Sequence, residues 1–237
     1  MKHIETYKIN VHDTDMNGYL SPTGHLRYMQ DCSNCHMEAV GPSYDELLEK
    51  HLSFILSRQK LQVYEPVFSH DEVTVSTWAT VSHGVTFERC YRVEKEGRTV
   101  AEVNSVWALL NTETGRLCKA AESGISYGSD EAIKMEMPRR LAVPENLEKL
   151  GERYVSYADA DKNMHMNNTK YADLVWGFVP EFVKKRVKTL DIIYVSEAPL
   201  GEKLEVFGGM SGDGYYVKTV REDGKVNVQA YIEWYEL

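Results

Sequence analysis

The chain has 237 residues, of which 43% are hydrophobic, and this length suits one large domain or two small ones. Its formal net charge of -9 argues against a general nucleic-acid binder, which needs a basic face to neutralise phosphates. The sequence shows no apolar run long enough to span a bilayer and no recognisable signal or transit peptide, so we expect a cytoplasmic protein without integral membrane association.

The first half predicts a strand over residues 4–12, an acidic turn, and a helix from about Pro22 to Val40 with Ser21 as its N-cap. Proline at the first helical position and Gly41 after the last one support these limits. Four further strands are predicted at about residues 53–65, 71–83, 85–95 and 99–111, with turns at the sequences SHGV, KEGR and NTETGR.

The acidic turn begins like a calcium-binding EF-hand loop, with Asp13, Asp15 and Asn17 at alternate positions. Such a loop requires a bidentate Glu at its twelfth position, and Gly24 stands there. An entering helix is also required, whereas the preceding residues alternate like a strand. The sequence therefore favours a strand-to-helix turn rich in local hydrogen bonds over a calcium site.

The four cysteines are expected to be buried or half-buried free thiols. The sequence CSNCH, which contains Cys32 and Cys35, matches the signature of covalent haem attachment. It lies within a helical pattern and no export signal accompanies it, so a haem or redox function is disfavoured for this pair and for Cys90 and Cys118.

The second half repeats the first. Asp159, Asp161 and Asn163 have the spacing of the first acidic turn, at an offset of 146 residues (161 - 15). A polar segment with two prolines, residues 126–151, separates the halves as a linker. The same order of elements recurs: a strand at 152–158, a helix from about Thr169 to Lys185, and strands near 188–197, 202–210, 214–221 and 226–235. A helix followed by antiparallel strands, present twice, predicts a sheet curled around each helix.

Only the second turn combines an acid, an amide and an imidazole, in Asp161, Asn163 and His165, because Tyr19 occupies the histidine position of the first turn. In an extended segment these alternate side chains point the same way. The following helix start offers unpaired N–H groups to a developing negative charge. This set suits attack on a carbonyl, and a capping role is the alternative, which we prefer for Asn167 and Asn168. Zinc is disfavoured because one histidine without a nearby cysteine does not fill its shell.

At these residues the sequence resembles the acyl-ACP (acyl-acyl-carrier-protein) thioesterases, which are double hotdog proteins. The resemblance covers nearly the whole chain and rests on DADKNMHMNNTKY and, more loosely, on HDTDMNGYLSPTGHLRYMQD. It implies that Asp161, Asn163, His165 and Glu197 are catalytic. Plant members often carry a cysteine directly after the glutamate, where this chain has Ala198. That departure favours attack by water or, as an alternative, by Asp161 through an acyl intermediate.

The resemblance implies an α+β fold of the tandem (double) hotdog type, with two long central helices each wrapped by a curved antiparallel sheet. The expected units are an N-terminal repeat at residues 1–125, the linker at 126–151 and a C-terminal repeat at 152–237. The expected reaction is hydrolysis of acyl-ACP to free fatty acid and carrier protein, without cofactor or metal. A coenzyme A thioesterase and a non-catalytic acyl-binding module are the alternatives. Fusion already supplies the pairing of two hotdogs, so we expect a monomer or a homodimer.

Candidate residues for the acyl pocket are Tyr28, Met29, Ile55 and Trp107, each with ordinary core packing as the alternative. The resemblance implies that the partner, acyl carrier protein, is strongly acidic. The basic run Lys184–Lys188 and the pair Arg139 and Arg140 are therefore candidate docking points. A solvated helix end remains the alternative for the basic run. We expect a single active site, because the first half lacks the imidazole.

Overall fold

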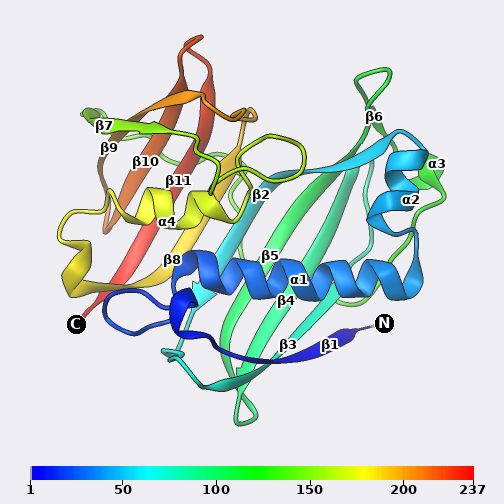
Figure 1. The fold of residues 1–237 in the computed structure, drawn as a ribbon, viewed down its shortest axis with the longest axis horizontal. Coiled ribbons are helices and arrows are strands. Elements are labelled where there is room, and N and C mark those ends of the chain that lie inside the picture. The colour runs from blue at the N-terminus through cyan, green and yellow to red at the C-terminus, as the bar shows by residue number, and fades with distance from the viewer. Residues whose placement is uncertain (1) are drawn as a thin grey trace.

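The computed structural model describes residues 2–237, and the strands of this part of the chain form one continuous antiparallel sheet (Figure 1). The first half contributes β1 (His3–Lys8), β2 (Leu52–Val63), β3 (Glu72–Ala79), β4 (Thr86–Lys95), β5 (Arg98–Asn111) and β6 (Arg116–Cys118). The second half contributes β7 (Glu148–Tyr154), β8 (Lys185–Tyr194), β9 (Lys203–Ser211), β10 (Gly214–Arg221) and β11 (Val226–Glu236). The helices are α1 (Pro22–Val40), α2 (Tyr44–Glu49), α3 (Ala120–Ser123) and α4 (Lys170–Trp176), with 3-10 turns η1 (Val11–Asp13) and η2 (Phe182–Lys184).

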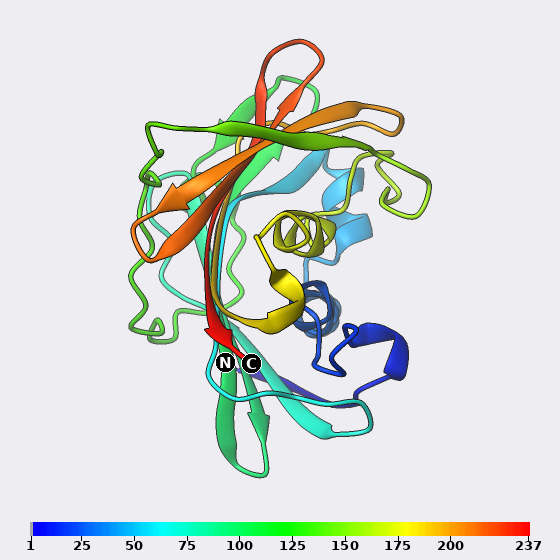
Figure 2. The same ribbon diagram turned by 90° about the vertical axis from the view of Figure 1, so that its left-hand side faces the viewer.

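The strand order shows the duplication. It runs β1-β3-β4-β5-β2 and then β8-β11-β10-β9-β7, so the second half repeats the first in reverse from a central seam. At the seam β2 pairs antiparallel with β8, from Arg58 opposite Ile193 to Gln62 opposite Thr189. Figure 2 shows the sheet on one side and both α1 and α4 on the other. This arrangement is the predicted double hotdog.

Helix α1 has the limits that the sequence predicts. The Ser21 hydroxyl accepts a hydrogen bond from the Gly24 N–H at 3.0 Å, and Pro22 occupies the first turn, where a missing N–H costs nothing. The helix ends at Gly41, whose φ of 63° is easy for a residue without a Cβ. Its sheet-facing side buries Leu26, Met29 and Cys32.

Helix α4 is shorter than predicted. The sequence predicts a helix from about Thr169 to Lys185, but the helix ends at Trp176 and the chain continues through a turn into η2. Pro180 explains the early end, because it has no N–H for a helical hydrogen bond and restricts the residue before it. The protein therefore has one long central helix and one short one, rather than two long ones.

The segment between the halves also departs from the expected limits. Strand β7 begins at Glu148, inside the segment predicted as a linker, and ends at Tyr154 rather than at residue 158. The preceding residues run along the first half: the Trp78 indole N–H donates to the Glu131 carbonyl at 2.8 Å, and the Asn104 amide donates to the Ile133 carbonyl at 3.1 Å. This stretch therefore covers strands β3 and β5.

The two halves share one core. Buried side chains of α1, α4 and both half-sheets form a single cluster that crosses the seam. The helices also meet, since the Thr23 hydroxyl donates to the Thr169 carbonyl at 2.8 Å and the Thr23 N–H donates to Asp173 at 2.9 Å. No helix within residues 2–237 is long and apolar enough to cross a membrane.

The predicted free thiols are confirmed. All four cysteines are unpaired, with Cys32 and Cys90 buried and Cys35 and Cys118 half-buried. The Cys32 thiol faces the sheet and donates to the Val75 carbonyl at 3.4 Å, and burial raises its pKa to about 12. Such a thiol stays protonated and acts as a small apolar core residue.

Candidate active site

The second acidic turn is a tight hairpin and not an extended segment. Its ends pair at Ala160 and Met166, and the Asp161 N–H donates to the His165 carbonyl at 2.9 Å. The Met164 N–H donates back to the Asp161 carbonyl at 3.0 Å. The prediction that alternate side chains of an extended segment point the same way is therefore wrong for this turn. The acid, the amide and the imidazole instead share one short hairpin, because the backbones of Asp161 and His165 are paired.

Glu197 lies beside this turn, as the resemblance implied. The hairpin is held against the segment after β8, because the Met166 N–H donates to the Ala198 carbonyl at 2.8 Å and His165 pairs with Pro199. These backbone contacts place Glu197 Oε2 3.5 Å from His165 Nδ1. The histidine side chain is 36% exposed and the glutamate 65%, so both are open to water and to a ligand.

Asn163 is oriented from both sides. Its backbone N–H donates to Asp161 Oδ1 at 2.8 Å, and its side-chain oxygen accepts a hydrogen bond from the Tyr44 hydroxyl at 3.1 Å. With the amide oxygen engaged, the amide NH₂ group remains as a donor for a ligand. Tyr44 starts α2 in the first half, and its ring also lies 3.5 Å from the Lys162 ammonium. Tyr44 was not predicted from the sequence, because no local pattern links two residues that lie 119 positions apart.

An apolar cavity of about 170 Å³ extends from this turn into the first half. Asp161, Asn163 and Asn168 of the second half line it on one side. Apolar and polar side chains from the rest of the chain complete the lining, and six of them are aromatic: Tyr44, Phe54, Phe87, Tyr91, Trp107 and Tyr127. Phe54 and Phe87 meet edge to face, with ring centroids 5.1 Å apart. The lining suits an apolar ligand whose polar end reaches Asp161 and Asn163.

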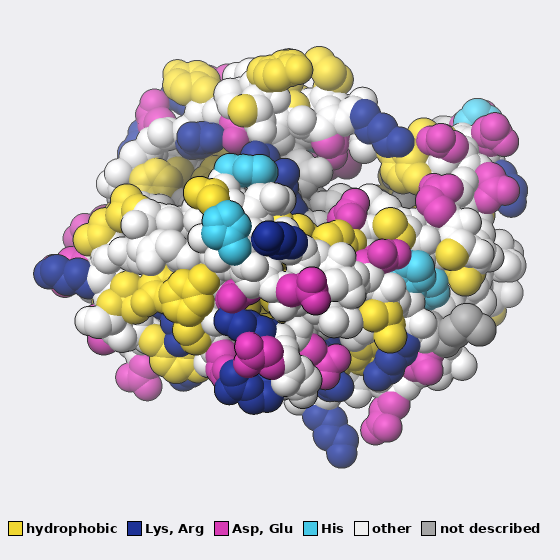
Figure 3. All heavy atoms as spheres, turned by 60° about the horizontal axis from the view of Figure 1, so that its bottom comes forward, with side chains coloured by type: hydrophobic (Ala, Val, Ile, Leu, Met, Phe, Trp, Pro, Cys, Tyr) yellow, Lys and Arg dark blue, Asp and Glu magenta, His cyan; other side chains and the backbone are white. Residues whose placement is uncertain are grey.

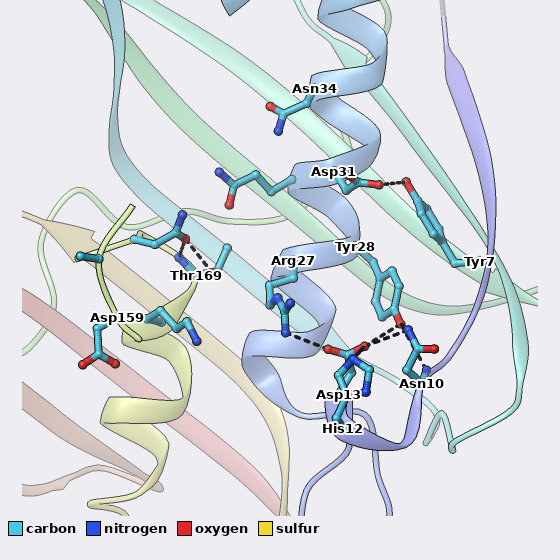
Figure 4. A pocket seen from close by; sticks show the side chains of 14 residues that line it. Tyr7, Asn10, His12, Asp13, Arg27, Tyr28, Asp31, Asn34, Asp159 and Thr169 are labelled. Carbon is cyan, nitrogen blue, oxygen red and sulfur yellow. Dashed lines mark hydrogen bonds and ion pairs between the residues drawn. The ribbon is translucent and has the colours of Figure 1, made fainter. Parts of the chain in front are cut away.

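The four pocket residues named from the sequence lie in different places. Trp107 lines the cavity. Met29 is buried and lines a small adjoining void of about 20 Å³ together with Trp107. Ile55 is on β2 and is not among the lining residues of either space. Tyr28 lies elsewhere, in a polar cleft where its hydroxyl donates to Asp13 at 2.8 Å (Figure 4).

The acids of the first turn have structural partners in that cleft. Arg27 and Tyr28 of α1 converge on the buried Asp13, with the arginine at 2.8 Å (Figure 4). Asp15 accepts the backbone N–H groups of Asn17 at 2.8 Å and Tyr19 at 3.1 Å. These contacts shape a turn, which explains the resemblance to an EF-hand loop without a calcium ion.

The helix start contributes less than expected. The predicted capping by Asn167 is wrong, because Thr169 is the N-cap of α4 and makes no side-chain capping hydrogen bond. The Asn167 side-chain oxygen instead accepts from the Thr169 N–H at 2.9 Å and the Thr169 hydroxyl at 2.8 Å, which shapes the turn before the helix. Asn168 is half-buried and lines the cavity, a position that capping alone did not predict. With only seven residues, α4 carries a weak dipole, so side-chain donors matter more for an oxyanion here.

The basic run is largely engaged within the protein. Lys185 is buried and donates to the Pro180 carbonyl at 2.8 Å, Lys184 pairs with Glu181 at 2.7 Å, and Lys188 with Glu233 at 3.3 Å. Arg139 and Arg140 are exposed. Acidic and basic side chains are interspersed over the face shown in Figure 3.

Comparison with known proteins identifies the family of the chain. The family model described as acyl-ACP thioesterase N-terminal domain matches residues 1–126, and that of the C-terminal domain matches residues 145–236. A dodecanoyl-[acyl-carrier-protein] hydrolase of Cinnamomum camphora is 24% identical over 97% of the chain and 66% of its own length. A palmitoyl-acyl carrier protein thioesterase of Arabidopsis thaliana is 24% identical over 79% of the chain and 50% of its own length. The chain thus matches between half and two thirds of the length of these relatives.

Solved structures share the fold. An acyl-ACP thioesterase from Bacteroides thetaiotaomicron superposes with a TM-score of 0.90 at 22% identity, covering 99% of this chain and 98% of that one. The 12:0-ACP thioesterase from Umbellularia californica gives a TM-score of 0.80 at 21% identity, covering 100% of this chain and 98% of that one. Because both family models match and together cover most of the chain, it belongs to the acyl-ACP thioesterase family.

Proposed function

We propose that the protein hydrolyses fatty acyl-ACP to free fatty acid and acyl carrier protein, as part of fatty acid biosynthesis. The observation that carries this proposal is an apolar cavity lined by Asp161 and Asn163, on the same hairpin that carries His165 and its partner Glu197. The names of the plant relatives support an acyl-ACP substrate.

In the proposed reaction, water attacks the thioester carbonyl carbon. Asp161 lines the cavity and has Oδ2 free of hydrogen bonds to the described residues, so it can position the water and take its proton together with Glu197. The free NH₂ group of Asn163 donates to the developing oxyanion. His165, held beside Glu197, orients this network or transfers a proton. The C–S bond then breaks, and the thiol, with an ordinary pKa near ~8.5, leaves with little acid assistance.

Water is the favoured nucleophile because the chain places no thiol at this site. Ala198 follows Glu197 and is buried, and all four cysteines lie in the first half. A covalent acyl intermediate on Asp161 is the remaining alternative for the first step. Single-turnover reactions in ¹⁸O-labelled water detect an acyl intermediate whose aspartyl carbonyl carbon is attacked by water, because a carboxylate oxygen of the protein then passes to the product and the label enters Asp161.

The test of the function compares one acyl chain carried by acyl carrier protein and by coenzyme A. We expect faster hydrolysis of the carrier-protein ester, and a strong preference for coenzyme A overturns the choice of substrate. A wild-type protein that binds acyl chains but hydrolyses neither ester above background is a non-catalytic acyl-binding module. A panel of carrier-bound chains of graded length then defines the preferred substrate.

A further inference from the structure

A buried arginine lines the apolar cavity. Arg89 is only 7% exposed, and it faces the helix side of the sheet together with Phe87 and Tyr91 of the same strand, β4. Strands β5 and β2 separate β4 from the second half. An acyl chain whose thioester lies at Asp161 and Asn163 therefore reaches Arg89 with the part that is farthest from the thioester.

The guanidinium has only neutral partners among residues 2–237. Its Nη1 donates to the Thr77 hydroxyl at 3.2 Å and lies 2.9 Å from His36 Nδ1, and its carbon lies 5.4 Å from the centre of the Tyr127 ring. Burial and the positive charge of Arg89 lower the pKa of His36 to about 4, so this histidine is neutral at pH 7 and accepts the hydrogen bond. Glu88 also lines the cavity but forms no ion pair with Arg89.

Several donors of the guanidinium remain unused. Arginine has five N–H groups, and the two described hydrogen bonds both involve Nη1. The N–H groups on Nε and Nη2 make no hydrogen bond to the described residues. An unsubstituted alkyl chain packed against them displaces water and offers no acceptor, which is costly for a buried cation.

We propose that Arg89 makes the inner part of the acyl cavity a polar subsite, which favours acyl chains bearing a hydroxyl, oxo or carboxyl oxygen where they reach the guanidinium. The inference rests on the proposed thioesterase function and narrows its substrate class. An oxygen acceptor satisfies the free N–H groups, and a carboxylate also neutralises the charge. The aromatic rings around the rest of the cavity hold the methylene groups.

The experiment measures kcat/KM for pairs of carrier-bound chains of equal length, one ending in a methyl group and one in a hydroxyl or carboxyl group. At the length that spans the cavity, we expect wild type to prefer the oxygenated chain. Arg89→Met keeps the volume but removes the charge and donors, and it should lower the ratio of oxygenated to methyl substrate about tenfold or more. Arg89→Gln keeps an amide donor and should give an intermediate ratio.

Phe87→Leu is the matched control, because Phe87 lies two positions earlier on the same face of β4 and lines the same cavity. It should change kcat/KM for both chains alike and leave their ratio near that of wild type. Thermal unfolding of each variant shows whether it is folded. If Arg89→Met does not fold, Arg89→Gln replaces it as the variant that tests the subsite.

The proposal is overturned if wild type prefers methyl-ended chains at every length and the arginine variants leave the ratio unchanged. That result leaves the thioesterase function intact. If wild type hydrolyses no thioester, the proposed function fails. Titration calorimetry with free fatty acids then tests whether the polar subsite exists. Tighter binding of ω-hydroxy than of unsubstituted fatty acids, lost in Arg89→Met, supports the subsite, and equal binding refutes it.

Discussion

The acidic turns that begin at Asp13 and at Asp159 share their backbone and differ in what faces them. The N–H of Asp15 donates to the Tyr19 carbonyl at 2.7 Å, and that of Asp161 donates to His165 at 2.9 Å. Each turn is anchored by a buried aspartate with an arginine at 2.8 Å, Arg27 in the first half and Arg153 in the second. The fold therefore uses this turn twice for the same structural purpose.

The surroundings separate the two copies. In the first, the Tyr19 ring packs on Phe68, with centroids 5.4 Å apart. In the second, the equivalent position is His165, and Glu197 lies beside it. Since the first turn forms without an imidazole or a facing carboxylate, folding does not require them in the second. The difference supports a catalytic role for the polar set.

The largest expected effect separates Asp161 from its counterpart Asp15. Both carboxylates accept the backbone N–H two residues later, at 2.8 Å, and asparagine preserves that hydrogen bond. Asp161→Asn removes a carboxylate that lines the cavity, so we expect kcat/KM for acyl-ACP to fall roughly 100-fold or more. Asp15→Asn should leave it near wild type. Equal activities of the two variants would remove Asp161 from the mechanism.

The next largest effect concerns how stability depends on pH at the seam between the halves. Asp191 of β8 is buried and lies 3.2 Å from Lys60 of β2, and burial outweighs the lysine to raise its pKa to about 6. The folded state thus holds this proton more tightly than the unfolded state, whose pKa is about 3.8. The resulting stability is fully present below pH 3.8 and is lost as pH rises through about 6, by about 3 kcal/mol.

Urea unfolding between pH 4 and 8 tests this dependence. Asp191→Asn should flatten the decline in the free energy of unfolding, whereas the exposed Asp45→Asn should keep the wild-type slope. An unchanged slope in Asp191→Asn assigns the pH dependence to other groups.

A smaller effect concerns the contact that each turn makes with the other half. The Tyr44 hydroxyl of α2 holds the Asn163 side chain at 3.1 Å, and the Asn17 amide of the first turn donates to the Val183 carbonyl at 3.2 Å. Tyr44→Phe should lower kcat about 3- to 10-fold with little change in KM, because one positioning hydrogen bond is lost. Asn17→Ala should lower stability by up to about 1 kcal/mol without lowering kcat.

Tyr44 acts through Asn163 in this scheme. Adding Tyr44→Phe to Asn163→Ala should therefore cause no further loss of kcat. Additive losses would show that Tyr44 contributes independently.

The smallest effect concerns one backbone position in each turn. Gly18 has a φ of 81° and Met164, its counterpart, a φ of 61°. Gly18→Ala should lower the free energy of unfolding by about 1 kcal/mol, because open space surrounds the site and only backbone strain opposes the Cβ. Met164→Gly should relieve that strain and match or exceed wild type in denaturant unfolding. A clear loss from Met164→Gly would mean that its side chain stabilises the turn.

Local patterns in the sequence predicted much of the fold. Ser21, Pro22 and Gly41 define α1 because capping and backbone preferences depend on near neighbours. The strands follow from alternation and turn residues, and the repeat of the acidic turn indicated the duplication. The apolar run after Thr169 predicts a longer helix than α4, which ends at Trp176. Pro180 is visible in the sequence and argues for this earlier end.

The site was predicted only in part. Asp161, Asn163 and His165 were indicated by the acidic turn, and Glu197 by the resemblance. The pairing of the turn with residues 198–200 places Glu197 beside His165, while Asp161 and Asn163 line the cavity. Tyr44 and Arg89 were not identified, since their importance depends on contacts with residues far away in the chain. Tyr28 was predicted to line the acyl pocket, but its hydroxyl donates to Asp13 in a different cleft.

The sequence by itself determined the duplicated strand–turn–helix units and the residues available for chemistry, because turns, caps and alternation act over a few neighbouring positions. Only the tertiary structure decided which copy faces a carboxylate, which side chain orients Asn163, and that a buried guanidinium lines the cavity. Those outcomes depend on how β2 meets β8 and how α2 packs on the second turn, and such long-range packing leaves no periodic signal in the chain.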